Sequence, residues 1–124
     1  MDIWNDEQRL ASHVNRLRAL VMIGGQFGRK IKLRTGSFSG VKTIGAFWMN
    51  KDTSCRYDYE LLIKEGRAKI IIVRGRELTN LTAETSKGTR IVRMPKGWTR
   101  IRVVGEKTDI EFKMELTKGI TDLE

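Results

Sequence analysis

The stretch CRYDYELLIK, residues 55–64, alternates apolar and charged side chains over most of its length. Its odd-numbered positions, from Cys55 to Ile63, are apolar or aromatic, and its even-numbered positions include Arg56, Asp58 and Glu60. A strand with this period of two buries one face and exposes the other, as strands of antiparallel sheets commonly do. We therefore expect an antiparallel strand here, with Cys55 and both tyrosines facing the core.

Similar short apolar segments lie on either side, separated by turn signals roughly every 8–12 residues, the spacing of sandwiches and barrels. Glu65-Gly66 reads as a tight hairpin, and the run from Ile70 to Val73 is apolar on both faces, which indicates a central strand. No helix-length pattern separates these segments, so a parallel α/β sheet is excluded. Eight strands are predicted, over residues 29–35, 41–49, 55–64, 68–74, 77–83, 89–94, 98–104 and 109–116.

The N-terminal part shows a different period. Four apolar residues recur at intervals of four, three and four positions, which is typical of one face of a helix: Leu10, Val14, Leu17 and Val21. Asn5 is a suitable N-cap, and Gly24 or Gly25 a suitable end. We expect an amphipathic helix over about residues 6–23. The predicted organisation is a helix with a glycine hinge (1–25), a β-sandwich (26–118) and a short tail (119–124).

Composition limits the function classes. The chain has 124 residues, enough for one domain, and a net charge of +9 that arises in residues 1–76, with 15 basic and 7 acidic side chains. One cysteine and one histidine leave no cysteine–histidine metal site and no intrachain disulfide, and no cofactor is expected. No nucleophile–base pair or carboxylate pair with catalytic spacing is visible, so we expect a protein that is not an enzyme.

The glycines of GGQFGRK, residues 24–30, do not form a phosphate-binding loop, because they are expected to end a helix instead of opening one. No segment approaches the roughly 20 apolar residues that span a bilayer. A cytoplasmic location is expected for the sequence as written, or a surface or secreted one if an export signal has been removed.

Residues 38–116 resemble small jelly-roll-like β-sandwich domains that occur in many bacterial proteins of unassigned function. The resemblance is carried by FSGVKTI (38–44), YDYEL (57–61), PKGW (95–98) and IRVVG (101–105). It implies an all-β antiparallel sandwich with jelly-roll-like connections. It names no catalytic signature. Such domains commonly follow a signal peptide or membrane anchor, where this chain has the predicted helix.

Three surfaces are candidates for binding. A basic surface for a polyanion comprises Arg9, Arg16, Arg29, Lys30, Lys32 and Arg34. A sheet face that could stack and clamp a ligand comprises Trp98, Arg100 and Arg102. The helical stripe of Leu10, Val14, Leu17 and Val21 could pair copies of the chain.

The sequence favours a non-enzymatic module that engages protein partners, including copies of itself. Two alternatives stay open. One is a basic module that binds nucleic acid or another polyanion through the basic surface. The other is carbohydrate binding on a sheet face, using Trp98 or Trp48.

Overall fold

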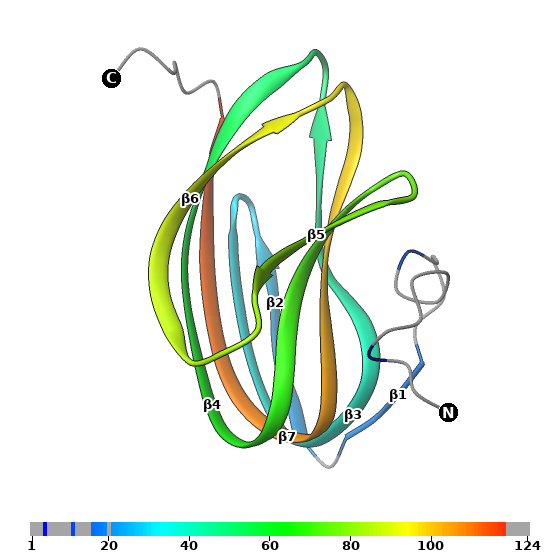
Figure 1. The fold of residues 1–124 in the computed structure, drawn as a ribbon, viewed down its shortest axis with the longest axis vertical. Coiled ribbons are helices and arrows are strands. Elements are labelled where there is room, and N and C mark those ends of the chain that lie inside the picture. Colours follow the sequence, from blue (N-terminus) through cyan, green and yellow to red (C-terminus); the bar gives the residue numbers. More distant parts are fainter. Residues whose placement is uncertain (1–3, 5–10, 12–15, 20, 119–124) are drawn as a thin grey trace.

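The computed structural model describes Trp4, Ala11, residues 16–19 and residues 21–118. Within this part, seven antiparallel strands form one sheet (Figure 1). Three of them are long and central, in the order β3–β7–β4, and four short strands pair with their outer sides. The strands are β1 (Arg16–Arg18), β2 (Val21–Phe27), β3 (Lys30–Met49), β4 (Thr53–Arg74), β5 (Glu77–Thr82), β6 (Ser86–Met94) and β7 (Gly97–Lys118).

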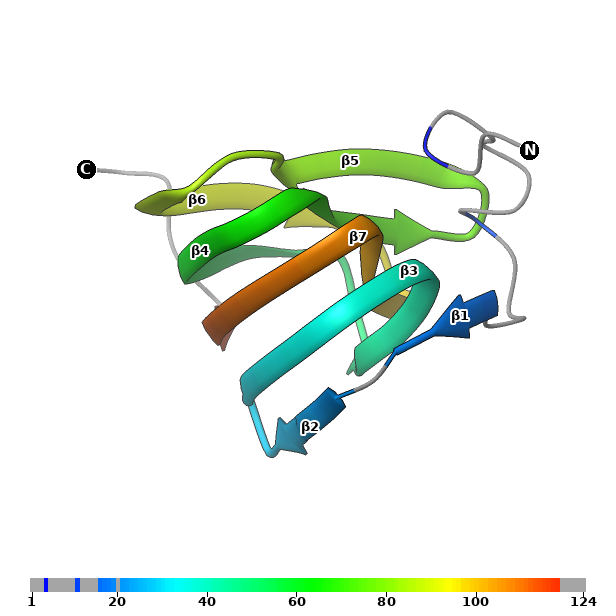
Figure 2. The ribbon, with the colours of Figure 1, turned by 90° about the horizontal axis from the view of Figure 1, so that it is seen from below.

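The three long strands fold back on themselves, so that one sheet makes two layers (Figures 1 and 2). The first layer contains β2, the first half of β3, the second half of β7, the first half of β4, and β6. The second layer contains β1, the second half of β3, the first half of β7, the second half of β4, and β5. The core lies between the layers.

Residues in the left-handed region bend each long strand without ending it. Ser37 in β3, Gly66 in β4 and Lys107 in β7 have φ values of 52°, 71° and 46°. The registers between neighbouring strands shift at these same places, as they do at β-bulges. In β4 the inward-facing positions change from odd numbers before the bend, such as Tyr57, to even numbers after it, such as Ile70.

Polar side chains satisfy backbone groups that the bend takes out of the ladder. The Ser37 N–H donates to Asp109 Oδ1 at 2.7 Å, and the Lys107 N–H donates to Ser39 Oγ at 2.9 Å. The Thr108 hydroxyl donates to the Glu65 carbonyl at 2.7 Å. These hydrogen bonds satisfy backbone groups at the bend, so that each 22-residue strand can pass from one layer to the other.

Side chains from both layers fill the core. The parity predicted for residues 55–64 is confirmed, since Cys55 and Tyr57 are fully buried and Leu61 is 1% exposed. The prediction that the run from Ile70 to Val73 is buried on both faces is also confirmed, because all four residues have zero exposure. The all-β antiparallel class follows directly from this pairing.

Three of the turns predicted from the sequence are bends within continuous strands in the structure. The sequence placed chain reversals at residues 36–40, at Glu65-Gly66 and at residues 105–107, whereas β3, β4 and β7 each continue through these positions. Six of the eight predicted strands are therefore halves of three long ones. A glycine in the left-handed region suits a hairpin and a bulge equally well, so the local sequence does not distinguish them.

The predicted helix over residues 6–23 is wrong at residues 16–18 and 21–23, whereas Ala11, also within that range, is helical. Residues 16–18 and 21–23 lie in β1 and β2 and pair with β3. Gly24 continues β2 with a φ of 130°, and a Cβ there would lie 2.1 Å from the Lys32 carbonyl oxygen. The sheet thus begins ahead of residue 26, where the sequence placed the domain boundary.

Tertiary pairing with the open edge of β3 explains this difference. Val21 and Ile23 are β-branched and favour strands once a partner edge is present. The Gln26 amide also pairs with both peptide groups of Ala46, accepting from its N–H at 2.8 Å and donating to its carbonyl at 3.0 Å. The helical spacing of four apolar residues is a local pattern, so it does not predict these long-range hydrogen bonds.

Candidate functional site

Two tryptophans form an exposed aromatic pair at one end of the second layer. Trp48 near the end of β3 and Trp98 near the start of β7 are direct cross-strand partners. Their rings meet edge to face, with centroids 5.4 Å apart and an interplanar angle of 65°. Trp48 is 46% exposed and Trp98 is 61% exposed, which is unusual for such large apolar rings. We call this pair the tryptophan end.

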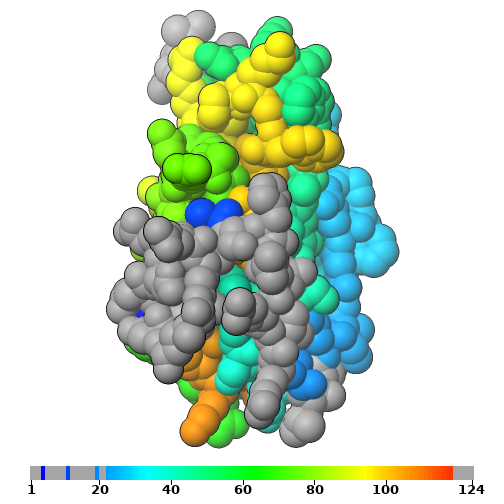
Figure 3. Space-filling model, turned by 90° about the vertical axis from the view of Figure 1, so that its right-hand side faces the viewer, coloured from blue at the N-terminus to red at the C-terminus, as the bar shows by residue number. Residues whose placement is uncertain are grey.

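A hollow of about 560 Å³ opens beside Trp98. One wall is the hairpin between β4 and β5, and the other is the connection between β6 and β7 (Figure 3, lime green and yellow). We call it the basic hollow, because four of its residues are cationic and one is acidic. Its lining residues are Arg74, Gly75, Arg76, Glu77, Pro95, Lys96, Trp98 and Arg100.

Local backbone geometry places the walls. Gly75 and Gly97 have φ values of 59° and 122°, which glycine adopts without steric cost. Gly75 allows the tight hairpin that carries Arg76, and Gly97 directs the chain from Lys96 into Trp98. The Lys96 N–H also donates to Asp52 Oδ1 at 2.9 Å, which holds the β6–β7 connection against the β3–β4 loop.

Arg74 is fixed within its wall. Its guanidinium donates to the Arg93 carbonyl at 2.8 Å and to Thr79 Oγ1 at 3.1 Å, and it lies 3.5 Å from Glu77 Oε2. Glu77 is thereby paired with Arg74, and no other acidic residue lines the hollow. The positive charge of Arg76 and Lys96 is left uncompensated by the lining residues.

The same outer face continues past Arg100 to a part that Trp4 and Ala11 cover. Val41, Ile71, Val73 and Val104 form a small apolar cluster there, against which Trp4 and Ala11 pack. Arg100 Nη2 donates to the Ala11 carbonyl at 2.6 Å. Arg100 therefore both lines the basic hollow and binds Ala11 on the covered part of the face.

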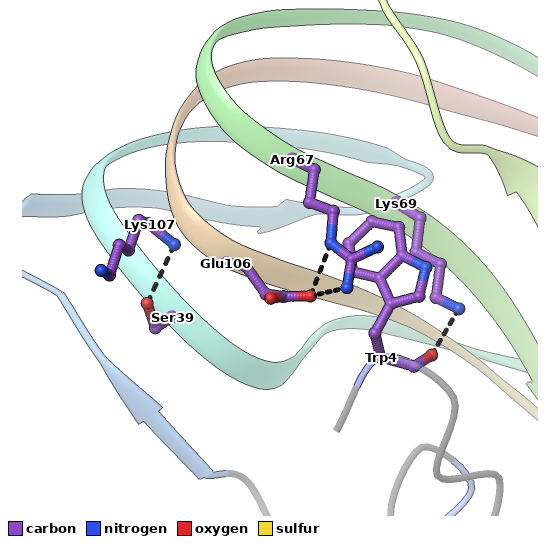
Figure 4. A network of polar contacts seen from close by, with 6 residues as sticks. All are labelled: Trp4, Ser39, Arg67, Lys69, Glu106 and Lys107. Carbon is purple, nitrogen blue, oxygen red and sulfur yellow. Dashed lines mark hydrogen bonds and ion pairs between the residues drawn. The ribbon is translucent and has the colours of Figure 1, made fainter. Parts of the chain in front are cut away.

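Trp4 is held by cations. The Arg67 guanidinium lies 4.2 Å and the Lys69 ammonium 4.7 Å from the centroid of its ring, and Lys69 also donates to the Trp4 carbonyl at 2.7 Å (Figure 4). Glu106 forms an ion pair with Arg67 and orients it. These contacts anchor Trp4 on the sheet.

The predicted sheet face of Trp98, Arg100 and Arg102 exists, but only part of it is accessible. All three lie on the outer face of β7, and their exposure falls from 61% to 8% to zero. Burial lowers the pKa of Arg100, and burial together with the nearby Arg100 charge lowers the pKa of Arg102 to about 10. Arg102 is therefore a buried part of the covered face, and Trp98 is the member that a ligand can reach.

The predicted basic surface is brought together in part. Lys30, Lys32 and Arg34 are exposed on the outer face of β3 in the first layer. In β7, Glu115 lies opposite Lys30 and Glu111, which forms an ion pair with Lys64, lies opposite Arg34, whereas Lys113 lies opposite Lys32. A shallow groove of about 380 Å³ crosses this face, with both signs of charge on its lining.

The other predicted site residues have mixed outcomes. Arg29 is exposed at the β2–β3 turn, and Arg16 is in β1. Leu17 and Val21 lie in two different strands, so the predicted arrangement of a helical stripe is wrong at these positions. Arg9, Leu10 and Val14 lie outside the described residues.

Arg76, Lys96 and Trp4 were not singled out from the sequence. The first two lie on turns far apart in the chain, at Gly75-Arg76 and Pro95-Lys96-Gly97. Each turn shows a basic residue beside a glycine, and that is the signal that could have found them once the strand order was known.

The described residues contain no group of three His, Cys, Asp or Glu side chains that could hold a metal ion. No helix in the described part of the chain is long and apolar enough to cross a membrane.

No protein-family profile and no curated protein matches this chain. Among solved structures, it is similar to carbohydrate binding modules of family 29. One of these, in complex with mannohexaose, has 17% sequence identity and a TM-score of 0.43, with 85% of this chain and 79% of that chain covered. A mutant of a family 29 module has 11% identity and a TM-score of 0.42, with 94% of each chain covered. A third structure of a family 29 module has 16% identity and a TM-score of 0.41, with 89% and 84% covered.

Proposed function

We propose that this protein is a non-catalytic module that binds a carbohydrate chain, with Trp98 as the stacking platform and the basic hollow as the pocket for a sugar unit. The exposed tryptophan end beside a hollow carries this proposal. A pyranose ring has an apolar face of C–H groups and a rim of hydroxyls. It therefore suits an indole face with hydrogen-bond donors around it.

The dimensions support a short saccharide segment. Pockets for small ligands commonly measure about 300–1,000 Å³. The basic hollow, at about 560 Å³, lies within that range. Trp48 meets Trp98 at 65°, so the two rings are not stacked face to face, and Trp98 stays 61% exposed for a ligand. Guanidinium and ammonium groups on both walls can donate to hydroxyl oxygens.

The alternatives from the sequence have less support. The prediction that copies of the chain assemble depended on a continuous helical stripe. It loses support because Leu17 and Val21 lie in strands. The polyanion interpretation used Lys30, Lys32 and Arg34, and acidic partners face two of these three. The tryptophan end combines exposure, concavity and hydrogen-bond donors in one place.

Isothermal titration calorimetry against a panel of neutral and acidic hexasaccharides tests the proposal. We expect saturable binding to at least one of them, abolished by Trp98→Ala. Phe27→Ala is the matched control, since Phe27 is an aromatic residue with 68% exposure at the β2–β3 turn and is not among the residues that line the hollow. Absence of binding to every oligosaccharide, or equal loss in both variants, would contradict the proposal.

A further inference from the structure

We infer that the sugar bound in the basic hollow is acidic, with its carboxylate or sulfate group held between Arg76 and Lys96; this inference rests on the proposed function. The shared chemistry is a pyranose that carries an anionic oxygen group. A uronate and a sulfated sugar both provide it.

Charge within the hollow supports this inference. Its lining contains Arg74, Arg76, Lys96 and Arg100 against Glu77 alone. Glu77 pairs with Arg74, and Arg74 also donates to Arg93 and Thr79. A neutral sugar would leave a net charge of +3 among the lining residues, whereas an anionic group would reduce it.

Arg76 and Lys96 differ from Arg74 and Arg100, whose guanidinium groups are held by hydrogen bonds. Arg100 donates to the Ala11 carbonyl, which directs its guanidinium toward the covered face. Among the described residues, no side-chain hydrogen bond or ion pair is found for Arg76 or for Lys96. They lie on opposite walls, on the β4–β5 hairpin and the β6–β7 connection, with Trp98 lining the same hollow. This arrangement places a cation on each side of a ring stacked on Trp98.

The extent of the site favours a sugar over a nucleic acid. Proteins that bind single strands use a continuous basic groove with successive aromatic platforms. Here the two rings are inclined by 65°, and Trp98 is the one aromatic residue among those that line the hollow. One stacking surface in a bounded hollow fits one or two sugar units.

The experiment compares four probes by calorimetry at low salt: a neutral cellohexaose, a galacturonate hexamer, a sulfated heparin hexasaccharide and the oligonucleotide dT10. The variants are Arg76→Gln/Lys96→Gln and, as a control with the same loss of charge, Lys30→Gln/Lys32→Gln. We expect the wild-type protein to bind an acidic saccharide about tenfold or more tightly than the neutral one. The Arg76→Gln/Lys96→Gln variant should lose that preference, and the control should keep it.

Binding of the acidic saccharides should also weaken as salt is raised from 50 to 500 mM, because salt screens exposed charges. Preference for the galacturonate or for the sulfated probe would identify which anionic group the hollow accepts, and either supports the inference. Equal binding of neutral and acidic probes, unchanged in Arg76→Gln/Lys96→Gln, would overturn the inference and leave the proposed function standing. Binding of dT10 alone, lost in Lys30→Gln/Lys32→Gln, would overturn both.

Discussion

Gly66 lies directly against the backbone of Lys107 where β4 and β7 bend together. A Cβ on Gly66 would lie 2.2 Å from the Lys107 carbonyl oxygen and 2.4 Å from the Glu106 carbonyl oxygen. Both Gly66 and Lys107 have positive φ values. Two neighbouring strands thus turn the same corner with their backbones in close contact, and the two-layer fold depends on that contact.

We therefore expect Gly66→Ala to destabilise the protein by about 3 kcal/mol or more, since backbone strain adds to steric overlap. The matched control is Gly75→Ala. Gly75 has a similar φ of 59° but open space where a Cβ would lie. It should cost only about 1–2 kcal/mol. Urea unfolding measures both. Equal costs would mean that the close approach at the bend contributes nothing.

These bends also mark the limit of what the sequence predicts. Alternation around Tyr57 and the apolar run after Ala68 correctly indicate which side chains are buried, because burial imposes a period on each strand half. The sequence does not indicate whether Gly66 reverses the chain or bends it, since φ is positive in both cases. That choice depends on β7, whose residues lie some forty positions away and bend at the same place.

The candidate site is likewise predicted only in part by the sequence. Trp98 is recognisable as a candidate from its position in a strand with Arg100. Arg76 and Lys96 become wall residues only because β4 pairs with β5, β6 and β7 at once, which brings two distant turns to one end. The buried Arg102 likewise lies opposite Ile71, a member of the apolar cluster against which Trp4 and Ala11 pack. Long-range pairing, which local patterns do not encode, decides all three.

Tyr57→Phe should stabilise the protein by about 1 kcal/mol at pH 7. The Tyr57 hydroxyl is buried and has no hydrogen-bond partner, so its removal relieves an unsatisfied polar group. Tyr59→Phe, on the same face of β4 but only partly buried, is the control and should change little. Urea unfolding at pH 7 provides the comparison. A cost above 1 kcal/mol for Tyr57→Phe would show that the hydroxyl contributes favourably.

The same residue predicts a pH dependence. Burial, with a smaller contribution from Cys55, raises the pKa of Tyr57 far above its ordinary value of 10.0. The unfolded chain therefore releases this proton above pH 10 while the folded protein keeps it, so stability falls as pH rises. At pH 11 the loss should be about 1.4 kcal/mol. Tyr57→Phe should reduce the fall between pH 9 and 11 by that amount. An identical fall in both proteins would place the tyrosine in contact with solvent.

Cys55 should react slowly with a thiol reagent. Its side chain is fully buried, with Sγ 3.9 Å from Met49 Sδ, and burial raises the pKa of the thiol, so less thiolate is present at neutral pH. We expect the rate of modification at pH 8 to rise by about a hundredfold or more when urea unfolds the chain. Kinetics with an aromatic disulfide reagent measure this. Rapid reaction of the native protein would contradict the placement of Cys55 in the core.

Trp4→Ala should destabilise the protein by about 2 kcal/mol, because it removes a ring that packs on the outer apolar cluster and faces two cations. Trp4→Phe keeps an aromatic face and should recover about half of the loss. Arg67→Gln removes one of the two cations together with its ion pair to Glu106, and leaves the ring in place. Because Trp4 does not line the basic hollow, all three variants should retain saccharide binding while they are folded. Urea unfolding and calorimetry on the same samples separate the two effects. Loss of binding in folded Trp4→Ala would mean that the covered face takes part in recognition, since Arg100 connects that face to the hollow through its bond to Ala11.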